Sequence, residues 1–191
     1  MNEKTLQEFV ERQVRGGFII VRLGISTAQL IDALGREAIA RTYVVSRQFS
    51  ITIRAGLSDK ELSVTIYHEI LEAATVASID PPEAVRSFNE GDFERAAYQG
   101  TKSSGKCLQR TSIACCNSTD SDDNDCVANR GDIQIELVKL SGGERLLRLA
   151  EPLSGLALER KLDAKRSVHD QKQQLLDVFA AALERAQLTA A

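Results

Sequence analysis

The strongest constraint on the fold is residues 59–78, which predict a helix that is apolar around most of its circumference. Ser58 and Glu61 form a capping box at its start, and Pro81 with Pro82 prevents the helix from continuing far beyond its end. Two apolar stripes run along it, formed by Leu62, Ile66, Ile70, Ala73 and Ala77 and by Val64, Tyr67, Leu71 and Ala74. Because both stripes must be covered, we expect this helix to be buried within a layered fold.

Strand and helix patterns surround this helix in the first half of the chain. Phe49, Ile51 and Ile53 alternate with polar residues and predict a half-buried strand within residues 42–57. Residues 18–23 are rich in β-forming side chains, whereas residues 3–15, 26–34 and 83–99 favour helices. These patterns predict an α+β domain over residues 1–100.

A change in composition separates this part from the rest of the chain. Residues 101–131 are rich in Cys, Ser and Asp and lack apolar periodicity, which predicts a linker or loop. The cysteines in this segment lack the C-x2–4-C spacing of a zinc ribbon, so we expect free thiols. They are Cys107, Cys115, Cys116 and Cys126. A fusion of two short genes would also produce such a break.

The second half, residues 132–191, has a different pattern. Ile133, Ile135 and Leu137 predict a strand, residues 141–144 a turn, and residues 145–149 and 156–162 two more strands. Apolar residues three and four apart from Val168 onward predict an amphipathic helix. We therefore expect a separate small domain, a three-stranded meander with one C-terminal helix.

The charged residues of this second half carry no evident catalytic pattern. Arg145, Arg148 and Lys161 alternate with acidic residues, which is typical of a solvated face. His169, at the start of the last helix, is expected at the surface. We expect this unit to form a protein-binding or homo-oligomer interface.

One short motif on the predicted buried helix could carry chemistry. His68 and Glu72 are one helical turn apart, so both side chains can reach a single ion, and Glu69 projects beside them. Zinc accepts imidazole nitrogen and carboxylate oxygen ligands, and a neighbouring carboxylate can accept the proton of a bound water. The alternative is that this polar stripe faces water and that His68 pairs with Glu72 as an exposed contact.

The strand at residues 49–53, the short turn and the His-Glu helix together resemble the minimal zincin module, and the ImmA/IrrE-type metallopeptidases most of all. The resemblance covers residues 18–97. It implies that His68 is the first metal ligand and Glu69 the general base. Glu72 then stands where the family has a second histidine.

The resemblance also implies a third, acidic ligand on a later helix. Glu90, Asp92 and Glu94 are the candidates, and we favour Glu90. A solvated acidic helix start would explain the same three residues. Because two carboxylates make the ligand set harder, manganese or iron(II) is an alternative to zinc.

Composition narrows the choice of function. The chain has 24 Lys and Arg against 27 Asp and Glu, a formal net charge of −3, which argues against general nucleic-acid binding. No apolar run is long enough for a membrane span, so we expect a cytoplasmic protein. Two functions follow: a metal-dependent hydrolase of zincin type acting on a peptide or protein, or its inactive descendant, and alternatively a non-enzymatic interaction or regulatory protein of the toxin–antitoxin or repressor kind.

Overall fold

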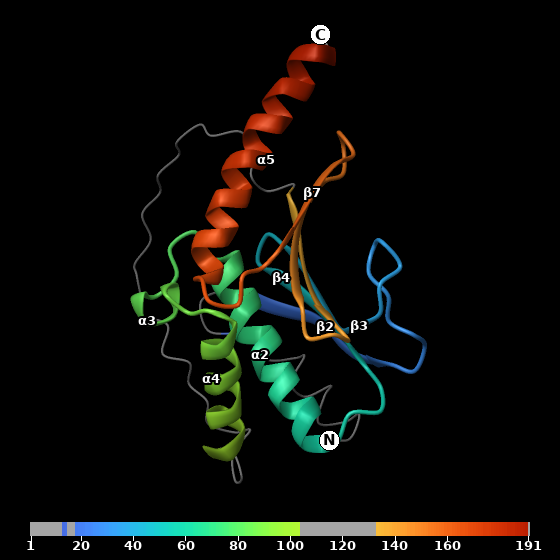
Figure 1. Cartoon of the computed structure of the whole chain (residues 1–191), viewed down its shortest axis with the longest axis vertical. Helices are drawn as coiled ribbons and strands as arrows, with labels where there is room; N and C mark the ends of the chain where they lie inside the picture. The colour runs from blue at the N-terminus through green and yellow to red at the C-terminus, as the bar shows by residue number, and fades with distance from the viewer. Residues whose placement is uncertain (1–12, 15–17, 104–132, 191) are drawn as a thin grey trace.

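The computed structural model describes residues 13–14, 18–103 and 133–190, and these form an α+β fold around one mixed sheet (Figure 1). Its strands have the spatial order β1-β2-β4-β3-β5-β6-β7. Of the strand pairs described, β2 with β4 is parallel and the others are antiparallel. The strand bounds are β1 (Gln13–Val14), β2 (Phe18–Ser26), β3 (Ala38–Val45), β4 (Gln48–Arg54), β5 (Gln134–Leu140), β6 (Arg145–Glu151) and β7 (Leu156–Lys161).

Helices cover one face of this sheet (Figure 1). Helix α2 (Asp59–Ala77) packs on β3 and β4, and α5 (Val168–Ala190) packs on β6 and β7. Helix α4 (Glu90–Ser103) lies along α2, and α3 (Glu83–Arg86) is a short turn before it. The predicted helix at 59–78 is confirmed with its capping box. No helix within the described ranges is both long and apolar enough to cross a membrane.

The two halves of the chain build a single sheet. The meander of β5, β6 and β7 and the helix after it are confirmed, but β5 pairs with β3 along seven residue pairs from Ala38↔Leu140 to Val45↔Gln134. Phe49 and Ile51 share one core with Leu147 and Phe179. The expectation of a separate small domain is therefore wrong at the level of the sheet, since the meander completes the sheet begun by the first half and the chain does not divide clearly into two domains.

The predicted linker falls mostly outside the described residues. Residues 101–103 of the segment belong to α4, whereas 104–131 and all four cysteines lie outside. The predicted boundaries at 100 and 132 therefore remain predictions.

Three local predictions in the first half differ from the structure in whole or in part. Residues 26–34 are not helical, because the Asp32 carboxylate accepts hydrogen bonds from the backbone N–H groups of Leu34 (2.9 Å) and Arg36 (2.7 Å) and stabilises a turn instead. The half-buried strand predicted within residues 42–57 is confirmed as β4, but residues 42–45 belong to β3, because the chain reverses at residues 46–47, where Ser46 has a φ of 54°. Residues 13–14, expected within a helix, form β1, and the rest of 3–15 lies outside the described residues.

Candidate metal centre

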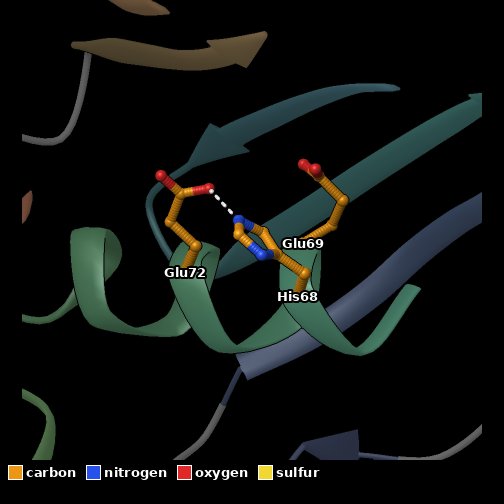
Figure 2. Close-up of side chains that lie close together, drawn as sticks. All are labelled: His68, Glu69 and Glu72. Carbon is orange, nitrogen blue, oxygen red and sulfur yellow. Dashed lines mark ion pairs between the residues drawn. The ribbon is translucent and has the colours of Figure 1, made fainter. Parts of the chain in front are cut away.

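The polar stripe of α2 lies between the helix and the sheet. His68, Glu69 and Glu72 are all buried, with exposed fractions of 3%, 0% and 0%. Figure 2 shows the His68 ring directed toward the Glu72 carboxylate, with Glu69 rising beside it toward the strands. The alternative that this stripe faces water is wrong, because α4, β3 and β6 cover it.

Helix α4 adds a fourth polar side chain to this place. Asn89 accepts a hydrogen bond from the backbone N–H of Asp92, and Asp92 accepts one from the backbone N–H of Asn89, both at 3.1 Å. This reciprocal cap starts α4 at Glu90, whose side chain is 12% exposed and reaches His68. Of the three acidic candidates, only Glu90 joins the His68 cluster, since Asp92 is used in the cap and Glu94 is exposed.

The imidazole Nε2 of His68 lies at the centre of the candidate ligand set. It is 3.4 Å from Glu72 Oε2 and 3.1 Å from Glu90 Oε2, yet it forms a hydrogen bond with neither, nor with any other described residue. Atoms about 2.0–2.2 Å from a zinc ion lie roughly 3.3 Å apart at the corners of a tetrahedron. The two distances therefore fit a shared metal ion, and a buried nitrogen without a hydrogen bond is the exception that such an ion would explain.

Glu69 is close enough to be either a ligand or a base. One ligand atom each from His68, Glu69 and Glu72 lie within 4.8 Å of one another, which is compatible with a metal ion. The Glu69 carboxylate is held from two sides. Thr42 Oγ1 on β3 donates to its Oε2 at 2.7 Å, and Arg145 on β6 donates to its Oε1 at 2.6 Å.

Arg145 brings a cation into the middle of the acidic cluster. Besides Glu69, its guanidinium contacts Glu72 through Nη2 and Glu90 through Nε, the latter at 2.7 Å. The side chain is 3% exposed. The expectation that Arg145 belongs to a solvated charged face is therefore wrong, because the pleat of β6 points it toward α2 together with Leu147 and Leu149.

Burial and neighbouring charges set the protonation of the cluster. Burial, together with the charges of Arg145 and Lys139, lowers the pKa of His68 well below 6.5, so its imidazole is neutral, the form that binds metals. Burial and the nearby Glu69 raise the pKa of Glu90 to about 8. The raised pKa reflects the cost of bringing a third acidic group into the buried cluster.

Two residues of this cluster, Arg145 and Thr42, were not predicted as site residues, although the sequence contains a signal for each. Arg145 is in phase with Leu147 and Leu149, and Thr42 is in phase with Ala40 and Val44, so each polar side chain lies on the apolar face of its strand. A polar residue at such a position requires a buried partner. The expectation that His169 lies at the surface is also wrong, since this residue is only 8% exposed.

The chain shows no similarity that would assign its function. No protein-family model matches it, and comparisons with curated proteins and with solved structures found no significant match. What the site can do must therefore be argued from its own residues.

Proposed function

We propose that this protein binds one divalent transition-metal ion through His68, Glu72 and Glu90 and uses it to hydrolyse a peptide-type bond, with Glu69 as general base. Zinc is the first candidate, and manganese or iron(II) suits the two carboxylates as well. The order of β4, a short turn and α2 supports a relationship to the zincin arrangement. A peptide or protein is the corresponding substrate.

The observation that carries this proposal is the His68 imidazole. A buried neutral histidine normally donates or accepts a hydrogen bond at each ring nitrogen that has no contact with water. Here Nε2 lies within 3.4 Å of two carboxylate oxygens without bonding to either. Glu72 Oε1 also has no hydrogen bond among the described residues, whereas Glu72 Oε2 and Glu90 Oε1 contact Arg145. A cation shared by the three side chains would give the His68 nitrogen the partner that it lacks.

The position of Glu69 supports its assignment as the base. A bound divalent ion would polarise a carbonyl group and make a nearby water more acidic. Glu69 lies next to His68 in sequence, and one of its oxygens lies within 4.8 Å of ligand atoms of His68 and Glu72. Its carboxylate is held by hydrogen bonds from Thr42 and Arg145. Its carboxylate can therefore accept a proton near the ion while the other three residues hold the ion.

A structural ion in a non-enzymatic interaction protein is the second candidate function. The fully buried Glu69 favours it, because both carboxylate oxygens already accept hydrogen bonds. A general base must release or exchange these partners before it can take a proton from water. The same ion would then stabilise the fold without turnover.

Peptide hydrolysis by wild type and two variants separates these functions. Glu69→Gln should keep the metal and lose turnover by about 100-fold or more, because it removes the base and not a ligand. Glu72→His supplies the usual second histidine of a zincin and should raise activity at matched zinc content. Each protein is assayed on a mixture of unstructured peptides, with the zinc content measured in the same sample.

Three outcomes are informative. Turnover that is unchanged by Glu69→Gln contradicts the assigned mechanism. Loss of zinc in Glu69→Gln makes Glu69 a ligand instead of the base. Full zinc content with no turnover in any of the three proteins selects the structural ion.

A further inference from the structure

We propose that Arg145 is the resident counter-ion of the metal centre, a positioning residue that holds the carboxylates together when no metal is bound. The inference rests on the proposed metal binding by His68, Glu72 and Glu90. It assigns a role to a residue of the second half of the chain that neither hydrolysis nor the ligand set requires.

The contacts of Arg145 carry the argument. Each nitrogen of its guanidinium faces a different carboxyl group: Nη1 faces Glu69 at 2.6 Å, Nε faces Glu90 at 2.7 Å, and Nη2 faces Glu72. Two of these three partners are the proposed carboxylate ligands. A planar guanidinium is suited to such a task because its donors have fixed directions, whereas a lysine would offer a single point of charge.

Burial makes a counter-ion necessary. Glu69 and Glu72 are 0% exposed, and carboxylates that leave water without a partner are strongly destabilising. In the described part of the chain, the ion pairs of these two carboxylates are with Arg145 and, for Glu72, with His68. Because a guanidinium stays protonated, Arg145 supplies a permanent positive charge within contact distance of both carboxylates.

A metal ion and Arg145 therefore serve the same carboxylates. Glu72 Oε2 faces both His68 Nε2 and Arg145 Nη2, and Glu90 directs Oε2 to His68 and Oε1 to Arg145. When the metal binds, it balances part of the negative charge of these carboxylates. Without Arg145 the metal must balance all of this charge, so folding of such a variant should depend on the metal far more than folding of the wild type.

Thermal unfolding with and without zinc tests this role. Arg145→Gln should lower the metal-free Tm by roughly 10 °C, because it leaves buried carboxylates without their cation. Zinc should then raise the Tm of Arg145→Gln by more degrees than it raises the Tm of wild type. Arg148→Gln is the matched control. Arg148 lies on the same strand, but its side chain is on the opposite face of the sheet, where its guanidinium lies 3.7 Å from the Glu136 carboxylate. Its response to zinc should equal that of wild type.

A double variant tests whether zinc acts at this site. In the protein that carries both His68→Ala and Arg145→Gln, zinc should no longer raise the Tm. If Arg145→Gln is recovered only unfolded, Arg145→Lys decides, because lysine keeps the charge but can contact fewer carboxylates, and its Tm should again rise more with zinc than that of wild type.

The possible failures are distinguishable. A zinc-induced rise in Arg145→Gln or Arg145→Lys that is no larger than in wild type contradicts the counter-ion role, even when wild type binds one zinc ion by equilibrium dialysis. A wild type that binds no zinc in the same dialysis contradicts the proposed metal site itself.

Discussion

Arg145 on β6 donates a 2.6 Å hydrogen bond to Glu69 on α2, a residue 76 positions earlier in the chain. Both side chains are buried, and the bond crosses the space between the sheet and the helix layer. The buried cluster of charged side chains is therefore built from both halves of the chain. The meander that completes the sheet also supplies the cation that the acidic helix requires.

Removing the second partner of Glu69 should weaken the fold. Thr42→Val keeps the shape of the side chain but deletes the 2.7 Å hydrogen bond from Thr42 Oγ1 to the buried carboxylate. The expected loss in the free energy of unfolding is about 1.5–3 kcal/mol, the usual range for a bond to a charged group. Urea denaturation measures it. Thr52→Val, on the opposite face of β4, should change stability by less than about 0.5 kcal/mol, and an equal loss in both variants would contradict this account.

The start of α2 can be tested independently of the metal. Ser58 accepts a hydrogen bond from the backbone N–H of Glu61, and Glu61 accepts one from the backbone N–H of Ser58. Ser58→Ala should therefore cost about 1 kcal/mol of unfolding free energy. Ser63→Ala, inside the same helix, should cost nothing because alanine is the better helix former. Equal stability of the two variants would show that the capping box contributes little.

Local sequence patterns predicted several parts of this structure, whereas the contacts between the two halves could not be predicted. The capping box, the alternation of β4 and the spacing of His68 and Glu72 are local patterns, and each of them predicted an element or a pairing that the structure contains. The pairing of β3 with β5 is not local, because the pattern within one half of the chain does not show which strand of the other half pairs with its free edge. The position of Arg145 depended on that pairing and was missed for this reason.

The stability should also depend on pH through His169 at the start of α5. Burial, aided by Lys172 and Arg86 and opposed by Asp170 and Asp80, lowers its pKa below 6.5. The unfolded chain therefore binds this proton more tightly than the folded protein. The stabilising contribution is present above pH 6.5 and is lost as the pH falls through the folded pKa.

A comparison of two proteins isolates this contribution. Urea unfolding of wild type and His169→Gln at about pH 7.5 and about pH 5.5 should show the larger loss of free energy in wild type. The same loss in both proteins would mean that the pKa of His169 is not lowered by folding.

Limited proteolysis tests how the halves are joined. The composition of residues 101–131 predicts that cleavage occurs there first. Because β3 pairs with β5 and Arg145 contacts Glu69, the two fragments should remain together in size-exclusion chromatography and separate only in denaturant. Fragments that separate under native conditions would contradict the single sheet.

Titration of the metal-free protein with zinc is the most direct test of the central claim, that His68, Glu72 and Glu90 hold one divalent ion. Calorimetry should give about one bound ion per chain for wild type. The affinity should fall by at least about 100-fold in His68→Ala and clearly in Glu90→Gln. It should be unchanged in Glu94→Gln, which alters an exposed acid one turn further along α4. Wild-type binding that survives His68→Ala undiminished, or no binding at all, would contradict the account.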